Sequence, residues 1–145
     1  MKLVLLWVVL IISGRMVPSQ GSLIQLIKMI KQATGKNPVF SYLNYGCYCG
    51  PGGKGQPKDA TDWCCKIHDC CYKRLMQQRC HVLVDRYNYS SISGDIKCCG
   101  RTQCQKEICQ CDKELALCLQ RNLVSYQKAY RFSWKSLCQE KNPKC

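Results

Sequence analysis

The sequence CCKIHDCCY, residues 64–72, sets two cysteine pairs on either side of an adjacent histidine and aspartate. Asp59 is a residue type that caps helix N-termini, and no proline follows it before Arg79, so we predict a helix through this stretch. Side chains of consecutive helical residues point about 100° apart, which prevents His68 and Asp69 from pairing with each other. We therefore expect the helix to direct these two side chains to different places, with cross-links leaving it before and after them.

The first 21 residues have the composition of a secretory signal peptide. Lys2 precedes an apolar run over residues 3–12, which is shorter than the roughly 20 residues that span a bilayer. Small residues at the end of the segment favour cleavage before Ser22. We therefore predict a signal peptide over residues 1–21 and a single secreted domain over residues 22–145.

All 15 cysteines lie after residue 21, where their density exceeds the roughly 8–10 % that marks a disulfide scaffold. Paired cysteines also bind zinc, but export to an oxidising compartment favours disulfides. A domain of this size buries a limited fraction of its surface, so we expect the bridges to supply much of its stability. The odd count leaves one cysteine without a partner.

The chain is strongly basic, with a formal net charge of +13 that falls to +11 if Lys2 and Arg15 leave with the signal peptide. Such a charge attracts acidic lipid surfaces, heparin-like polymers and nucleic acid. Secretion disfavours nucleic acid as a partner. We expect an anionic membrane surface to be preferred, while heparan-type polyanions and a cell-surface receptor stay open.

Three further elements follow from local patterns. Apolar residues recur at helical spacing from Leu23 to Ala33 and stop before Gly35, which predicts a short amphipathic helix. Ser93-Gly94 between two short polar and β-branched runs predicts a small β-hairpin. A second long helix is predicted from about Gln105 to Asn122, where apolar residues and cysteines share one face.

Residues 45–55, YGCYCGPGGKG, contain too many glycines and a proline for a regular element and are predicted to form a loop. A glycine-rich loop is commonly a plain turn. Calcium, however, takes six to eight oxygen ligands that include backbone carbonyls, and glycines let several carbonyls converge on one ion. Because Asp69 can add a carboxylate, we predict a Ca²⁺ site formed by this loop and Asp69.

Asp112 on the second long helix is the candidate partner of His68. A buried carboxylate must accept hydrogen bonds, and His68, Tyr72 and Tyr87 are available donors. A carboxylate on one ring nitrogen fixes the tautomer and stabilises the imidazolium that forms when the other nitrogen takes a proton. With no serine or free cysteine nucleophile in the run, we expect His68 to activate water. A solvated helix carboxylate is the alternative for Asp112, and His81 is assigned to the surface.

Residues 64–72 and the loop segment YGCYCGPGG, residues 45–53, resemble the secreted phospholipase A2 family. The similarity covers residues 22–145, and the cysteine spacing with the tail that ends at Cys145 resembles the group II branch and its IID type. The resemblance implies a mainly α, disulfide-rich fold. Its parts are two long antiparallel helices cross-linked by disulfides, an N-terminal amphipathic helix, a calcium-binding loop and a small β-hairpin.

By this resemblance the chain is a monomeric, calcium-dependent hydrolase that cleaves the sn-2 ester of glycerophospholipids to a lysophospholipid and a fatty acid. His68 is the implied general base, supported by Asp112, and Tyr72 and Tyr87 steady that carboxylate. The implied calcium ligands are the carbonyls of Tyr48, Gly50 and Gly52 and the carboxylate of Asp69. The Gly50 amide is implied to stabilise the oxyanion, and the first helix to line the acyl channel.

The resemblance also implies seven disulfides: Cys47–Cys138, Cys49–Cys65, Cys64–Cys118, Cys70–Cys145, Cys71–Cys111, Cys80–Cys104 and Cys98–Cys109. Cys99 matches no cysteine of the family, so an exposed free thiol is expected, with dimerisation or exchange with Cys98 as alternatives. Pro51 is a second departure, because proline restricts Gly50 and removes a loop amide. Asn88-Tyr89-Ser90 is a possible glycosylation site.

A non-catalytic reading uses the same scaffold as a cationic receptor- or heparin-binding protein. Inactive relatives often replace the calcium-binding aspartate, whereas this chain retains both His68 and Asp69. The enzyme is therefore the favoured interpretation. Trp63 and Trp134 are expected either in the core or at a lipid interface.

Overall fold

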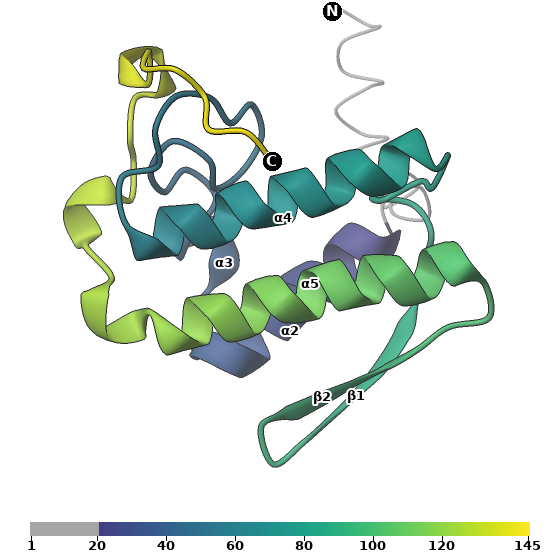
Figure 1. Ribbon diagram of the computed structural model, residues 1–145. Coiled ribbons are helices and arrows are strands. Elements are labelled where there is room, and N and C mark those ends of the chain that lie inside the picture. Colours follow the sequence, from purple (N-terminus) through teal and green to yellow (C-terminus); the bar gives the residue numbers. More distant parts are fainter. Residues whose placement is uncertain (1–20) are drawn as a thin grey trace, which may run out of the picture.

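The computed structural model describes residues 21–145, and its longest elements are two helices that lie side by side (Figure 1). Helix α4, Ala60–Gln77, carries both cysteine pairs together with His68 and Asp69. Its N-cap is Asp59, whose side chain accepts a hydrogen bond from the backbone N–H of Asp62. The predicted central helix is confirmed. The predicted signal peptide lies outside the described residues, apart from Gly21.

Helix α5, Gln103–Arg121, runs antiparallel to α4 (Figure 1). It begins at a capping box, because Thr102 accepts from the Gln105 N–H while the Gln105 side chain accepts from the Thr102 N–H. Two disulfides join the helices: Cys64–Cys118 and Cys71–Cys111. The earlier cysteine of α4 pairs with the later one of α5, which is the pairing that an antiparallel arrangement requires.

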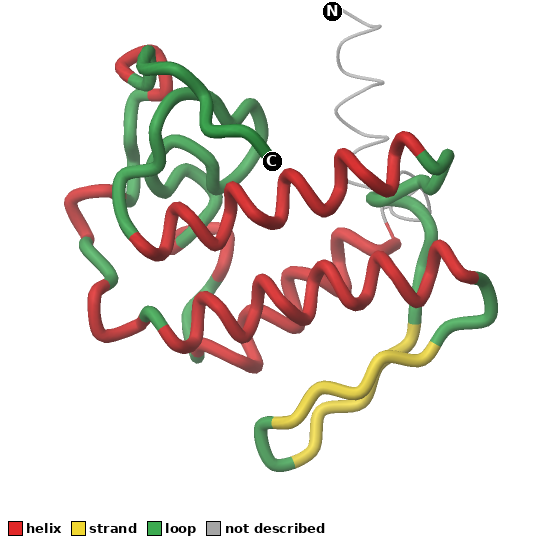
Figure 2. Tube along the Cα trace, viewed as in Figure 1, coloured by secondary structure: helices red, strands yellow, loops and turns green. Residues whose placement is uncertain are grey.

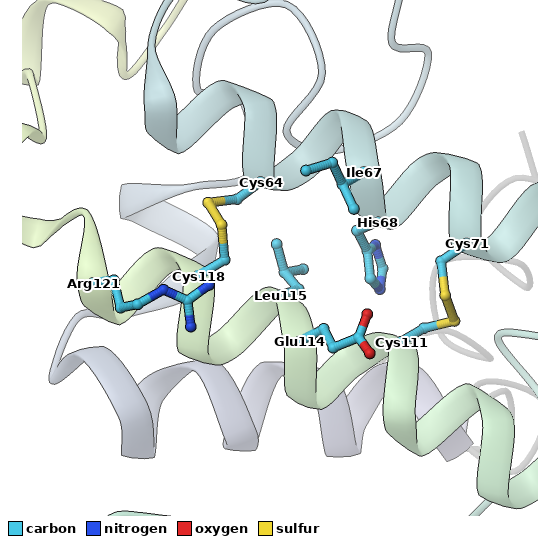
Figure 3. Close-up of a pocket in the computed structure, with 9 residues that line it drawn as sticks. All are labelled: Cys64, Ile67, His68, Cys71, Cys111, Glu114, Leu115, Cys118 and Arg121. Carbon is cyan, nitrogen blue, oxygen red and sulfur yellow. A yellow bond between two sulfur atoms is a disulfide. The ribbon is translucent and has the colours of Figure 1, made fainter. Parts of the chain in front are cut away.

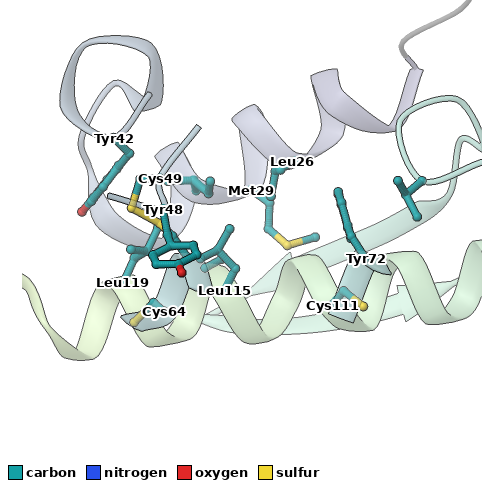
Figure 4. Packing of buried hydrophobic residues seen from close by; sticks show 14 of the residues in the cluster. Leu26, Met29, Tyr42, Tyr48, Cys49, Cys64, Tyr72, Cys111, Leu115 and Leu119 are labelled. Atoms are coloured by element: carbon teal, nitrogen blue, oxygen red, sulfur yellow. A yellow bond between two sulfur atoms is a disulfide. The ribbon is translucent and has the colours of Figure 1, made fainter. Parts of the chain in front are cut away.

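Helix α2, Gly21–Thr34, lies behind α5 in the view of Figure 1 and packs against it. Leu26 and Met29 turn toward α5 and close the hydrophobic core, as Figure 4 shows. The helix ends at Thr34, and the next residue, Gly35, has a φ of +72°, a left-handed conformation that favours glycine. The predicted amphipathic helix is thus confirmed, with its apolar face buried in the core.

The β-hairpin, yellow in Figure 2, projects from one end of the helix pair. Strands β1, Asn88–Ile92, and β2, Asp95–Cys99, pair antiparallel with Asn88 opposite Cys99. Most of its side chains are exposed, but Ile96 is buried and the Cys98–Cys109 disulfide fastens the hairpin to α5. The predicted hairpin is confirmed, and so is the expected tether.

The glycine-rich loop and the C-terminal segment lie together at the other end of the helix pair (Figure 1). The loop follows α3, Pro38–Ser41, a four-residue helix that the apolar pattern did not predict. The C-terminal segment forms three short 3₁₀ turns, Leu123–Ser125, Lys128–Tyr130 and Lys135–Leu137. The Cys47–Cys138 and Cys70–Cys145 disulfides hold this segment to the loop and to α4. Among residues 21–145, no helix is both long and apolar enough to cross a membrane.

Candidate active site

The structure brings His68 of α4 and Asp112 of α5 together between the helices. Nε2 of His68 lies 2.8 Å from Oδ1 of Asp112. His68 is 8 % exposed and Asp112 is completely buried. The alternative of a solvated Asp112 carboxylate is therefore wrong, and the burial explains why this carboxylate needs strong donors.

Two tyrosine hydroxyls complete the surroundings of Asp112. Tyr72 donates to Oδ1 and Tyr87 donates to Oδ2, each at 2.6 Å. Burial, followed by the charge of Asp112, raises the pKa of both phenols well above the usual value of 10. Both tyrosines therefore keep their protons and act as donors throughout the physiological pH range.

The hydrogen bond to Asp112 sets the protonation pattern of the His68 ring. Asp112 already accepts two hydroxyl protons and offers acceptor capacity to Nε2–H. Nδ1 is then the unprotonated nitrogen and can accept a proton. The Tyr72 ring packs on the imidazole with 4.0 Å between centroids, which further restricts its orientation.

Asp69, one residue further along α4, belongs to the loop side of the site. A Cβ on Gly53 would lie 2.8 Å from Oδ2 of Asp69 and 2.5 Å from Cδ1 of Tyr48, so the loop backbone closely approaches the carboxylate. Burial raises the pKa of Asp69 to about 6, although the charges of His68 and Lys135 oppose this shift. A partly buried carboxylate of this kind is stabilised when a cation binds beside it.

Some loop carbonyls accept hydrogen bonds from the protein and others do not. The carbonyl of Cys47 accepts from the Lys54 N–H at 3.4 Å, and the carbonyl of Cys49 accepts from Nζ of Lys135 at 2.8 Å. Among residues 21–145, nothing donates a hydrogen bond to the carbonyls of Tyr48, Gly50 or Gly52. Free carbonyl oxygens in a loop whose Gly53 backbone approaches the Asp69 carboxylate suit a hard cation such as calcium. The residues present therefore fit the ion that the sequence implies.

Glycine is required at two positions of the loop. Gly50 and Gly52 have φ values of +86° and +78°, and a Cβ on Gly50 would lie 1.7 Å from the Leu43 carbonyl oxygen. Pro51 lies exposed between them, so the proline coexists with the left-handed conformation of both neighbours.

Side chains alone could not hold a metal ion in the described part of the chain. Residues 21–145 contain no group of three or more histidine, cysteine, aspartate or glutamate side chains that could hold a metal ion. A metal at Asp69 would therefore take most of its ligands from the loop backbone and from water.

A cavity of about 250 Å³ reaches His68 from between α4 and α5 (Figure 3). His68 and Glu114 point toward the same space, which the two interhelical disulfides also line. Neither Asp69 nor any loop residue lines this cavity. The cavity and the loop therefore share no lining residue.

The structure contains the seven disulfides that the resemblance implied. Cys99 is an exposed free thiol in β2. Asn88 is exposed at the start of β1, and His81 is exposed beyond the end of α4. Trp63 and Trp134 are 38 % and 78 % exposed, so the core interpretation is wrong for both side chains.

Sequence reasoning missed two charged residues that contact the loop. Asp62, in the first turn of α4, accepts hydrogen bonds from the amides of Cys47 and Tyr48 at 2.7 and 2.8 Å. Lys135 reaches the Cys49 carbonyl from the C-terminal segment. An aspartate in the first turn of a helix could have been predicted to stabilise the helix N-terminus. No local sequence pattern, however, indicates that the glycine-rich loop packs against Asp62.

Comparisons with known proteins agree with the geometry. The family model described as phospholipase A2 matches residues 23–131. The chain is 49 % identical over 146 residues to the group IID secretory phospholipase A2 of Homo sapiens, with both chains fully covered. It is 52 % identical to the Mus musculus protein of the same name, covering 88 % of this chain and 89 % of that one. Acidic phospholipase A2 jerdoxin of Protobothrops jerdonii is 49 % identical, covering 97 % and 98 %.

Proposed function

The chain belongs to the phospholipase A2 family and is a secreted enzyme of that class, and from this premise we propose that it hydrolyses the sn-2 ester of glycerophospholipids with His68 as the general base. The observation that carries this assignment is the buried His68–Asp112 pair with two tyrosine donors. Asp69, the residue after His68, lies beside the loop backbone at Gly53. The products are a lysophospholipid and a free fatty acid.

His68 moves the proton in this mechanism. Nδ1 takes a proton from a water molecule as the water oxygen attacks the ester carbonyl carbon. Asp112 stabilises the resulting imidazolium through Nε2, and the hydroxyls of Tyr72 and Tyr87 hold the carboxylate in place. When the ester C–O bond breaks, the imidazolium returns the proton to the departing glycerol oxygen, which balances the hydrolysis.

The loop supplies the electrostatic part of the proposed mechanism. The carbonyls of Tyr48, Gly50 and Gly52 together with Asp69 would hold Ca²⁺, which supplies a positive charge that polarises the ester carbonyl. The Gly50 amide is the proposed donor to the developing oxyanion. The fit rests on the free carbonyls and on the close approach of Gly53 to Asp69.

We expect a phospholipid membrane surface to be the substrate-bearing partner. Exposed apolar side chains occur on α2, on α3 and just after it: Ile24, Val39, Phe40 and Leu43. Because α2 and α3 pack together, these side chains belong to neighbouring elements. The excess of basic residues favours anionic over zwitterionic lipid. Heparan-type polyanions and a cell-surface receptor are further anionic or protein partners compatible with the same charge.

Fatty-acid release from anionic phospholipid vesicles tests the assignment. We expect release with calcium, loss of release with EGTA, and loss in His68→Gln, whereas His81→Gln should keep wild-type activity. His81 is the matched control because it is the only other histidine and is exposed away from Asp112. Release that survives both EGTA and His68→Gln would contradict the mechanism. Vesicle binding without any release, in calcium, would favour the non-catalytic binding protein.

A further inference from the structure

We propose that Asp62 is a positioning residue that holds the calcium-binding loop, residues 45–55, in its ion-accepting conformation before the ion arrives. The inference rests on the proposed calcium site and adds a residue to it. Asp62 makes no contact with His68 or Asp112 in the structure, so it acts on the reaction through the loop alone.

The Asp62 carboxylate is completely buried and is surrounded by backbone amides. Oδ2 accepts from the N–H groups of Cys47 at 2.7 Å and Lys58 at 2.8 Å, while Oδ1 accepts from the N–H of Tyr48 at 2.8 Å. In the part of the chain that the structure describes, no lysine, arginine or histidine forms an ion pair with Asp62. Amide hydrogen bonds and the N-terminal end of α4 therefore stabilise this charge.

The loop backbone is shaped to reach this carboxylate. Gly46 has a φ of +59°, and a Cβ at that position would lie 2.3 Å from Cγ of Asp62. Any larger residue would push the chain away from the carboxylate. The contact between the loop and Asp62 therefore requires glycine at position 46.

This contact determines where the loop carbonyls can go. Asp62 holds the amides of Cys47 and Tyr48 from inside the protein, and Lys135 holds the Cys49 carbonyl from the C-terminal segment. The Tyr48 hydroxyl donates to the Gly55 carbonyl at 2.6 Å, which ties Tyr48 to the last residue of the loop. The carbonyls of Tyr48, Gly50 and Gly52, which accept no hydrogen bond from residues 21–145, are left for an ion. Preorganisation of this kind lowers the ordering cost of binding.

Asp62→Asn tests the proposal because it keeps the side-chain shape but replaces one acceptor oxygen with an NH₂ group that faces amide donors. We expect the calcium dissociation constant, measured by calorimetry without lipid, to rise about tenfold or more. Fatty-acid release should return at high calcium concentration, with an unchanged pH profile. A purely structural role would instead lower the Tm equally with and without calcium.

Asp59→Asn is the matched control, because Asp59 lies at the same helix N-terminus but binds the Tyr45 hydroxyl and no loop amide, and asparagine keeps an acceptor oxygen and caps helices. Its calcium affinity should stay close to that of the wild type, because Asp62 still binds the amides of Cys47 and Tyr48. Equal calcium affinity of the wild type and Asp62→Asn would overturn this proposal alone. Failure of the wild type to bind calcium would overturn the proposed calcium site together with it.

A measurement on the wild type keeps the proposal testable if Asp62→Asn does not fold. Amide hydrogen exchange should show that the Cys47 and Tyr48 N–H groups are protected in calcium-free protein, because Asp62 already binds them. Rapid exchange of both amides without calcium, followed by protection when calcium is added, would show that the ion orders the loop and would overturn the proposal.

Discussion

Asp112 shows how a single buried residue sets the chemistry of its neighbours. Its two oxygens accept from His68, Tyr72 and Tyr87, so the carboxylate is fully engaged without any lysine or arginine. The same contacts keep His68 in the tautomer whose Nδ1 accepts a proton. The acid–base property of the site therefore belongs to this group of four residues and not to the histidine alone.

Asp112→Asn is expected to lower kcat/KM by about 10²–10⁴-fold, because a neutral amide stabilises the imidazolium poorly and can favour the wrong tautomer. Calcium affinity should be unchanged, since Asp112 does not contact the loop. Steady-state release assays and calcium calorimetry on the same preparation measure the two effects. Full activity in this variant would contradict the assignment of His68 as the general base.

Asp69 predicts a pH dependence of calcium binding. Its pKa of about 6 in the calcium-free protein means that it is mostly ionised at pH 7 and mostly protonated at pH 5. Since calcium needs the ionised form, the apparent affinity should fall about tenfold from pH 7 to pH 5. Calorimetry of calcium binding to the wild type at pH 7 and at pH 5, without lipid, measures this change. Affinity that stays constant from pH 7 to pH 5 would be inconsistent with the raised pKa.

The same raised pKa has a consequence for stability in the absence of calcium. The folded protein binds the Asp69 proton more tightly than the unfolded chain, whose carboxyl has the ordinary pKa of 3.8. The stabilisation is therefore fully present below about pH 4 and is lost as the pH rises through about 6. Calcium should remove this loss, because the ion stabilises the ionised carboxylate.

At the scale of elements, disulfides fix the positions of the helices relative to their neighbours, and caps stabilise the helix ends. Four bridges leave α4, at Cys64, Cys65, Cys70 and Cys71, so the turn that presents His68 and Asp69 is held from several directions. Two of these bridges lead to α5, which keeps Asp112 opposite His68. Helix ends are instead stabilised locally, as at Thr102, where the capping box begins α5.

Thr102→Ala is expected to destabilise the protein by about 1 kcal/mol, because it removes the side-chain acceptor of the Gln105 N–H. Thr102→Ser, which keeps the hydroxyl, should be close to wild type. Guanidinium unfolding with the disulfides intact measures the difference. Fatty-acid release should be equal in all three proteins, because the Cys71–Cys111 bridge holds the segment with Asp112 in place. Equal stability of the alanine and serine variants would mean that the cap contributes nothing.

The whole molecule combines a strong positive charge with a buried acid–base pair and exposed apolar side chains on α2 and α3. The charge acts over the distance set by ionic strength, about 10 Å at 0.1 M salt, whereas apolar contacts are insensitive to moderate salt. Association with a membrane therefore has two components that salt can separate.

Binding of His68→Gln to anionic vesicles should weaken about tenfold or more between 0.05 and 0.5 M salt, because several basic residues near the surface each contribute roughly 1 kcal/mol. Binding to zwitterionic vesicles should change little. Co-sedimentation with vesicles measures both, and the variant avoids lipid consumption. A preference for anionic vesicles that persists undiminished at high salt would rule out the electrostatic explanation.

Local sequence patterns predicted α2, α4, α5 and the hairpin, because apolar periodicity, caps and turn residues act over a few neighbouring positions. The different roles of His68 and Asp69 could also be predicted from the local sequence, because adjacent side chains on a helix point in different directions. The pairing of His68 with Asp112 was a chemical expectation, and the burial of both in the folded chain provides its reason.

Only the tertiary structure decided which groups surround the glycine-rich loop. Asp62, Lys135 and the C-terminal segment reach it from positions that are close in space but separated along the sequence. Their contacts depend on how α4 and the Cys47–Cys138 bridge place the chain, which no short pattern contains. The sequence by itself thus determined the elements and the reactive residue types, whereas long-range packing decided which carbonyls stay free for an ion.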